Sequence, residues 1–321
     1  MRAMTLQADD LIDQFFRQQK NPVVITGASG WLGRSTIEVI REYVPDEEFE
    51  SKVLLVGSRR RVEQFPRGLE LNVESLDEVC KRKIDISGLV HLAFLTRDHA
   101  AKLSWESYVS QNLMILNHGI ALTRKNPSWV ITVSSGAIFD QETGKLETDA
   151  LKNPYGFLKR VEEKLIADEA LLAGANSVHG RLWGASGVDM PCPEKYAIGS
   201  MAIDHVNGVD IKVTSAHPVY RRYVDAREFM KLSLAAAING DLLTFDSGGP
   251  LVELGELAQV FASQAPSKSL NVVRPAIDSS LESDSYYPKS NSYELLAEKY
   301  GVSILDIEAQ CRNTVLGINR S

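Results

Sequence analysis

The sequence predicts an α/β fold, in which a doubly wound parallel sheet is followed by a smaller C-terminal lobe. Short apolar runs rich in valine, isoleucine and leucine alternate with helical patterns along the chain. This alternation, repeated about every 30 residues, is typical of parallel βαβ units. The run within residues 52–57, Val-Leu-Leu-Val, is continuously apolar, as expected for a strand that helices cover on both faces of a sheet.

Composition excludes several classes of function. The chain has 321 residues, 44% hydrophobic and 24% charged, as in an ordinary globular protein with one large or two small domains. Its net charge of −7 gives no electrostatic reason to bind nucleic acid or an anionic membrane. Three isolated cysteines lack the spacing of a metal site or a disulfide framework, so we expect no metal and a reducing, cytoplasmic location. We recognise no signal peptide and no membrane-spanning stretch.

The patterns predict the following elements. We expect strands at residues 23–26, 52–57, 69–73, 88–94, 129–135 and 179–184. We expect helices within residues 1–20, at 35–43, 75–83 and 105–125, from Pro154 onward, and at 250–262 and 292–300, with a polar connection at 45–50. These elements divide the chain into an N-terminal helical extension (1–20), a nucleotide-binding domain (21–190) and a substrate-binding lobe interleaved with the last strands (191–321).

A glycine-rich turn joins the first strand to the first helix of the sheet. Gly27, Gly30 and Gly33 are spaced by three residues in the segment Gly-Ala-Ser-Gly-Trp-Leu-Gly. Glycines allow the backbone to bend sharply and a pyrophosphate to come close, and a helix N-terminus offers free N–H groups. The turn therefore predicts binding of a dinucleotide phosphate.

Three arginines follow the second predicted strand. The segment Gly57-Ser58-Arg59-Arg60-Arg61 stands where an acidic residue would bind a ribose 2′-hydroxyl and an arginine would accommodate a 2′-phosphate. Guanidinium groups form bidentate hydrogen bonds to phosphate. Because no acid follows the strand directly, we predict NADP(H) rather than NAD.

A serine, a tyrosine and a lysine form a candidate catalytic group. Ser134 and Ser135 end the fifth strand, and Tyr155 and Lys159 share one helix face at positions i and i+4. An ammonium near a phenol favours the phenolate, which allows a tyrosine to exchange a proton with a carbonyl or alcohol oxygen. A serine at the end of the strand can hydrogen-bond the same oxygen. His91, in an apolar strand, is expected to be a hydrogen-bonded core residue.

Together, Gly27-x-x-Gly30-x-x-Gly33, Ser135 and Tyr155-x-x-x-Lys159 resemble the extended (atypical) short-chain dehydrogenase/reductase family. This group includes NAD(P)-dependent sugar-nucleotide epimerases, dehydratases and ketoreductases, and the resemblance covers roughly residues 20–310. It implies a Rossmann fold, with Tyr155 as the acid/base, Lys159 on the nicotinamide ribose and Ser135 orienting the substrate oxygen.

The resemblance implies further binding residues. The expected cofactor-binding residues are Gly27, Ser29, Gly30, Trp31, Leu32, Gly33, Ser58, Arg59, Arg60, Leu92, Ala93, Asn112, Tyr155 and Lys159. Arg221 or Arg222 would hold a substrate diphosphate, and we favour Arg222. Gly184 replaces an asparagine that the family often has. Family members often form homodimers through the helices that here carry Trp105 and Tyr155.

Several functions remain open. The first is reduction of a nucleotide-linked keto sugar by NADPH, and the second is NAD-dependent 4-epimerisation. Reduction of a non-sugar ketone or aldehyde also fits. A 4,6-dehydratase is disfavoured because Gly136 and Ala137 replace the acidic pair that follows the family's threonine. A non-catalytic redox sensor is disfavoured because the Tyr155–Lys159 pair is present.

Overall fold

A computed structural model describes residues 7–140, 143–264, 270–278 and 280–319. The chain forms two compact units. Unit 1 comprises Met1–Leu182, Met230–Phe245 and Lys299–Val302, and unit 2 comprises Trp183–Phe229, Asp246–Glu298 and Ser303–Ser321. Each is described separately below.

Unit 1 is built on a mostly parallel eight-stranded sheet, as the sequence predicted. The strand order is β12-β7-β6-β5-β1-β2-β4-β3. The strands are β1 (Val23–Thr26), β2 (Val53–Gly57), β3 (Arg61–Phe65), β4 (Leu69–Ser75), β5 (Gly88–His91), β6 (Trp129–Ser135), β7 (Asn176–Leu182) and β12 (Leu243–Asp246). β3 is antiparallel to β4, whereas β1, β2, β4, β5, β6 and β7 pair in parallel with their neighbours in this set.

The strand order reverses at β1. This strand pairs with β2 on one side and with β5 on the other, so that Thr26 lies opposite both Val56 and His91. From β1 the chain builds outward first through β2 and β4, and then through β5, β6 and β7. In open α/β sheets, ligands bind beyond the carboxyl ends of the strands at such a reversal. By this rule, a ligand is expected to bind at the segments that follow β1 and β5.

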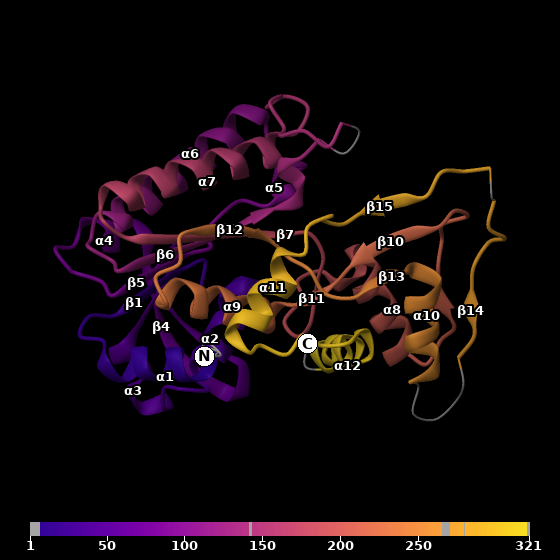
Figure 1. The fold of residues 1–321 in the computed structure, drawn as a ribbon, viewed down its shortest axis with the longest axis horizontal. Coiled ribbons are helices and arrows are strands. Elements are labelled where there is room, and N and C mark those ends of the chain that lie inside the picture. Colours follow the sequence, from indigo (N-terminus) through magenta and orange to yellow (C-terminus); the bar gives the residue numbers. More distant parts are fainter. Residues whose placement is uncertain (1–6, 141–142, 265–269, 279, 320–321) are drawn as a thin grey trace, which may run out of the picture. The chain divides into compact units, whose positions relative to one another are not determined.

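Helices cover both faces of this sheet (Figure 1). α6 (Trp105–Thr123) and α7 (Pro154–Leu172) lie side by side on one face, with α4 (Leu76–Lys81) packed against α6. Apolar side chains of these helices, among them Leu116 and Ile166, form a buried core with Val24, Leu89 and Val130 of the strands. On the other face lie α1 (Ala8–Gln18), α2 (Trp31–Ile40) and α3 (Asp46–Lys52).

One prediction of local structure is wrong, and one strand was not predicted. Residues 45–50, expected to be a polar connection, begin α3, whose first turn is acidic and whose single buried side chain is Phe49. The segment after Arg60, for which we predicted no element, forms the edge strand β3 with the sequence Arg-Val-Glu-Gln-Phe. One apolar residue in α3 gives no helical periodicity, which explains why the sequence did not reveal this helix.

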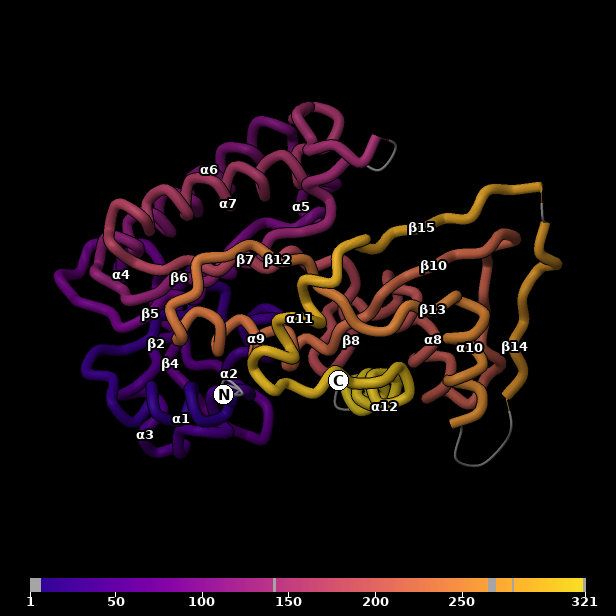
Figure 2. The backbone as a smooth tube through the Cα atoms, in the orientation of Figure 1, coloured from indigo at the N-terminus to yellow at the C-terminus, as the bar shows by residue number. Residues whose placement is uncertain are grey.

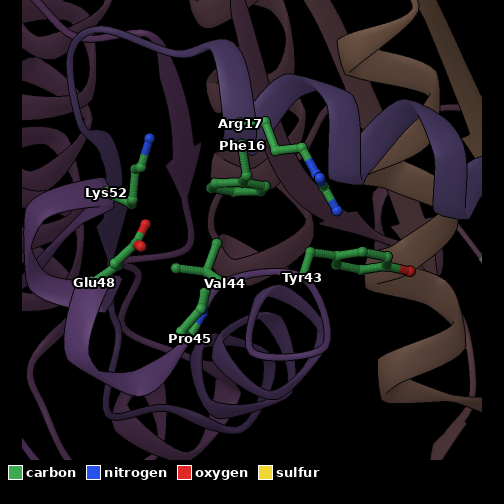
Figure 3. Close-up of a pocket in the computed structure, with 7 residues that line it drawn as sticks. All are labelled: Phe16, Arg17, Tyr43, Val44, Pro45, Glu48 and Lys52. Carbon is green, nitrogen blue, oxygen red and sulfur yellow. The ribbon is translucent and has the colours of Figure 1, made fainter.

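The described part of the N-terminal extension forms the expected helix, α1, which packs on the rest of unit 1. Ile12 and Phe16 of α1 are buried, and the Phe15 ring lies 5.5 Å from the Trp129 ring. Beside α1 lies a hollow of about 320 Å³ (Figure 3). It is lined by Phe16, Arg17, Tyr43, Val44, Pro45, Glu48 and Lys52. Because none of the expected site residues lines it, this hollow is separate from the candidate site.

Unit 2 combines three small sheets with helices (Figure 2). β10 (Val219–Arg222) pairs with β13 (Leu251–Glu253) and β15 (Asp284–Tyr286), β8 (Ala185–Ser186) with β11 (Val224–Asp225), and β9 (Ile211–Lys212) with β14 (Val272–Val273). α8 (Ala197–Val206), α10 (Leu254–Ser263) and α12 (Ile307–Ile318) pack on one another. α9 (Ala226–Ile238) and α11 (Ser292–Tyr300) each contribute residues to both units. In the described residues, no helix is both long enough and apolar enough to cross a membrane.

Candidate active site

The glycine turn is tightly packed against the strand ends. Gly27 has φ +66°, and a Cβ atom there would lie 2.8 Å from the backbone of Leu92 and Ala93. A Cβ at Gly33 would lie 2.4 Å from the Gly27 carbonyl oxygen. Both positions therefore require glycine for the fold itself, since neither contact is with a side chain that could move.

Gly30 is required less by packing than Gly27 and Gly33. It is exposed, precedes α2 in an extended conformation, and its missing Cβ would lie 3.2 Å from the nearest atom, the Gly27 oxygen. Trp31 and Leu32 begin α2, whose first-turn N–H groups have no intrahelical acceptor. An open glycine before a helix N-terminus fits the pyrophosphate of a dinucleotide.

The ends of β1 and β5 are joined by one buried threonine. The Thr26 hydroxyl oxygen accepts hydrogen bonds from the backbone N–H groups of Leu92 and Ala93, each at 3.1 Å. It also lies 2.9 Å from Nδ1 of His91, which confirms the prediction of a hydrogen-bonded core histidine. These bonds fix Leu92 and Ala93, two of the expected cofactor-binding residues, directly against Gly27.

The arginine segment differs from the expectation in one respect. Arg59 and Arg60 are exposed after β2, whereas Arg61 begins β3 and lies over Gly57, whose Cβ would be 3.1 Å from its Nη1 atom. Arg61 donates to the Ser29 hydroxyl. The structure thus places a guanidinium group beside the glycine turn, but it belongs to Arg61, which was not among the expected cofactor-binding residues.

An acid also lies beside the turn, although none follows β2 directly in sequence. Glu63 accepts a hydrogen bond from the Ser29 hydroxyl at 2.5 Å and forms ion pairs with Arg61 and Arg34, both at 2.7 Å. Although burial raises the pKa of Glu63, hydrogen bonds from Ser29 and Arg61 hold it below its ordinary value. Sequence spacing did not indicate this acid, because Glu63 lies on β3, a strand that was not predicted.

The turn after β6 positions the start of α7. Ser135, the last residue of β6, is buried, and its hydroxyl accepts a hydrogen bond from the Ala137 N–H at 3.2 Å. Asn153 caps α7 by accepting from the Gly156 N–H at 2.9 Å, and it donates to the Ala137 oxygen at 3.0 Å. A Cβ at Gly156 would lie 1.9 Å from that same oxygen. The helix that carries Tyr155 therefore starts directly against the turn that follows Ser135.

Lys159 reaches back from α7 to β6. Its ammonium donates to the Val133 carbonyl oxygen at 2.9 Å and to Glu162 Oε2 at 2.8 Å, and it lies 3.8 Å from the centre of the Phe94 ring. The Lys159 side chain is only 8% exposed and that of Glu162 only 3%. The lysine is thus held at the strand end two residues before Ser135, by a carboxylate that the sequence analysis did not single out.

The Tyr155 ring contacts one aromatic and one cationic side chain. Its half-buried ring meets the Phe94 ring edge-on at 5.8 Å, and the Arg97 guanidinium lies 5.7 Å from its centre. Phe94 therefore contacts both Tyr155 and Lys159. Neither Phe94 nor Arg97 was expected at the site, because their segment after β5 carries no recognisable motif.

Asn112 supports this segment from α6. Its buried amide accepts from the Leu95 N–H at 2.8 Å and donates to the Leu95 oxygen at 3.3 Å. The Tyr108 hydroxyl donates to the same oxygen at 2.7 Å. Asn112, expected among the cofactor-binding residues, thus holds the backbone next to Phe94 with both ends of its amide.

The candidate diphosphate-binding arginines lie in unit 2, each with an acidic partner. Arg222 pairs with Glu294 at 2.9 Å, and Arg221 pairs with Asp284 at 2.7 Å. Gly184, where the family often has asparagine, packs on Arg222, because a Cβ there would lie 2.3 Å from the Arg222 carbonyl oxygen. Close packing of the backbone accounts for this departure from the family pattern.

Comparison with protein families identifies the chain. A family model described as the NAD dependent epimerase/dehydratase family matches residues 23–242. The chain belongs to this family, which confirms the resemblance, and it is therefore an enzyme that uses a nicotinamide dinucleotide. No curated protein matches it.

Solved structures show the same fold at low identity. A UDP-N-acetylglucosamine 4-epimerase from Methanobrevibacter ruminantium M1, in complex with UDP-N-acetylmuramic acid, is 16% identical, with 94% of this chain and 99% of that chain covered and a TM-score of 0.70. RMD from Pseudomonas aeruginosa, complexed with NADPH, is also 16% identical, with 94% and 100% covered and a TM-score of 0.63. MoeE5 in complex with UDP-glucose and NAD is 16% identical, with 93% and 99% covered and a TM-score of 0.67.

We predict that alanine substitutions at Gly33 and Gly30 have different effects. Gly33→Ala forces a Cβ onto backbone oxygens, so we expect it to destabilise the protein by about 1–3 kcal/mol or more. Gly30→Ala should lower the thermal unfolding temperature less than Gly33→Ala, because its Cβ would lie 3.2 Å from a single backbone oxygen, yet it should weaken the binding of NADPH or NADH at least about tenfold, roughly 1.4 kcal/mol. Thermal unfolding and fluorescence titration measure the two effects. Unchanged cofactor binding by Gly30→Ala would show that the pyrophosphate lies elsewhere.

Proposed function

We propose that the protein is an NADP(H)-dependent oxidoreductase that reduces the carbonyl of a nucleotide-linked keto sugar. The observation that carries this proposal is the junction between β6 and α7, which holds Ser135, Tyr155 and Lys159 in one part of unit 1. The glycine turn after β1 supports a dinucleotide in the same unit.

Each residue of this group has a distinct proposed role. The bound cofactor supplies a hydride to the carbonyl carbon. Tyr155 donates its phenolic proton to the oxygen as negative charge develops there, and Ser135 hydrogen-bonds the same oxygen. Lys159, whose ammonium lies near this end of β6, stabilises the phenolate that remains and offers a donor to the nicotinamide ribose.

Replacement of the phenol tests these roles. Tyr155→Phe keeps the ring that packs against Phe94 but removes the proton donor, so we expect kcat to fall by about 10²–10⁴-fold. Cofactor affinity should change little. Steady-state kinetics with an active carbonyl substrate, together with a cofactor titration, measure both quantities. Full turnover by this variant would overturn the assignment of Tyr155.

The arginines at the end of β2 support NADP(H). Arg59 and Arg60 are exposed and extend from the turn after Gly57, and Arg61 lies beside Ser29. Guanidinium groups suit a 2′-phosphate. The cofactor therefore carries this phosphate in our proposal, and net reduction follows from the usual use of NADPH as a reductant.

One observation favours a second function. The Glu63 carboxylate lies 2.5 Å from the Ser29 hydroxyl, where it could accept a hydrogen bond from a ribose 2′-hydroxyl and would repel a 2′-phosphate. An acid in this place supports NAD, and with it a 4-epimerase that retains its cofactor. Reduction of a non-sugar ketone or aldehyde remains a further alternative.

Two sets of variants distinguish the cofactors. If NADP(H) is used, Arg59→Ala/Arg60→Ala should weaken NADPH binding at least about tenfold and leave NADH binding unchanged, while Glu63→Gln should not weaken NADPH binding. If NAD is used, Glu63→Gln should weaken NADH binding, and the double arginine variant should bind both cofactors like wild type. Arg124→Ala, which removes an exposed arginine paired with Glu169, is the matched control. Fluorescence titration measures each affinity.

The proposal also covers the substrate-binding lobe, the oligomeric state and the location of the protein. We assign residues 191–321 to substrate binding, with Arg222 as the residue for the diphosphate. Exposed apolar side chains on α6 and α7, such as Met114 at 55% and Leu165 at 41%, support a homodimer. Cys80, Cys192 and Cys311 are free thiols, which supports a cytoplasmic location.

A further inference from the structure

A buried ion pair lies behind the candidate catalytic residues. Lys159 and Glu162 stand one helical turn apart on α7, with Nζ and Oε2 separated by 2.8 Å. Pairs at this spacing are common on exposed helix faces, where they contribute little. This pair is different, because both side chains are almost entirely removed from water.

Glu162 supplies the counter-charge in this interior. Its Oε1 atom lies 3.8 Å from Nε2 of His91 on β5, and burial lowers the pKa of His91 to about 3, so this histidine is neutral. β6 contributes only the Val133 carbonyl to the lysine. The next acid on α7, Glu163, pairs with Arg181 at 2.5 Å. Among the described residues that accept a hydrogen bond from Lys159, Glu162 is the acidic one.

The Lys159 ammonium has two hydrogen-bond acceptors among the described residues, and the Phe94 ring lies 3.8 Å from it. An ammonium has three N–H groups, and here one donates to Val133 and another to Glu162. Two fixed acceptors determine where the nitrogen sits and where its remaining N–H group points. Without the carboxylate, a buried ammonium would lose a proton or move toward water, and in either case the remaining donor would no longer be held in place.

We propose that Glu162 is a positioning residue that holds the Lys159 ammonium at the end of β6 and thereby sets how tightly the nicotinamide ribose is bound. The inference rests on the proposed function, in which Lys159 contacts that ribose. Burial raises the pKa of the Glu162 carboxyl, although the Lys159 charge opposes this. Acidification should therefore protonate Glu162 and release the lysine, with His91, Lys159 and Glu163 as the titratable groups around it.

The test is a cofactor titration with matched variants. Glu162→Gln should weaken NADPH binding at least tenfold at neutral pH, whereas Glu163→Gln should bind within twofold of wild type. Lys159→Met should weaken binding, and the double variant Lys159→Met/Glu162→Gln should be no weaker than Lys159→Met alone, because Glu162 acts through the lysine. Wild-type affinity should fall on acidification toward that of Glu162→Gln, which should lack this pH dependence.

Each outcome bears on the inference. Unchanged or tighter NADPH binding by Glu162→Gln, or additive effects of the two substitutions, would overturn it. If Glu162→Gln does not fold, Glu162→Asp keeps the charge but withdraws it by one methylene; a loss of affinity there supports the inference, and wild-type affinity overturns it. The same titrations are made with NADH. Failure of the wild-type protein to bind either cofactor would overturn the proposed function first, and the inference with it.

Discussion

The close contact between the ends of β1 and β5 is the constraint on which the site depends. Gly27 leaves no room for a side chain against Leu92 and Ala93, and Thr26 binds the N–H groups of both residues. This contact lies where the strand order reverses, so it fixes the floor of the crevice that such sheets offer to ligands. The segment that continues from Ala93 then carries Phe94, which contacts both Tyr155 and Lys159.

A second close contact positions the residues that we propose to be catalytic. Gly156 packs on the Ala137 carbonyl oxygen, so α7 starts directly after the turn that follows Ser135. Beneath it, the Lys159–Glu162 pair is buried beside neutral His91. A charged pair in such a place costs desolvation free energy that well-packed apolar residues would not, so its presence is weak evidence for a role in stability alone. A functional role for the pair accounts better for its burial.

The sequence revealed those features that rest on regular patterns. Strand β6 was predicted at its observed bounds, because it is a short run rich in β-branched residues, and Pro154 marked the start of α7. Contacts that form only through tertiary packing were not predicted. Glu63 reaches Ser29 only through the edge strand β3, and Glu162 looks like a surface residue until the packing of α7 is known. The spacing of residues in the sequence predicts neither contact.

We propose that the enzyme reduces its substrate rather than epimerising it. Measuring the net consumption of cofactor distinguishes these two reactions. The purified protein would be incubated with NADPH, and separately with NADH, and a panel of nucleotide-linked keto sugars, and both oxidised cofactor and sugar product would be quantified. If the enzyme is a reductase, one NADPH is oxidised for each sugar nucleotide reduced. Interconversion of sugar nucleotides without net cofactor consumption, by protein that retains tightly bound NAD, would contradict it and establish the epimerase.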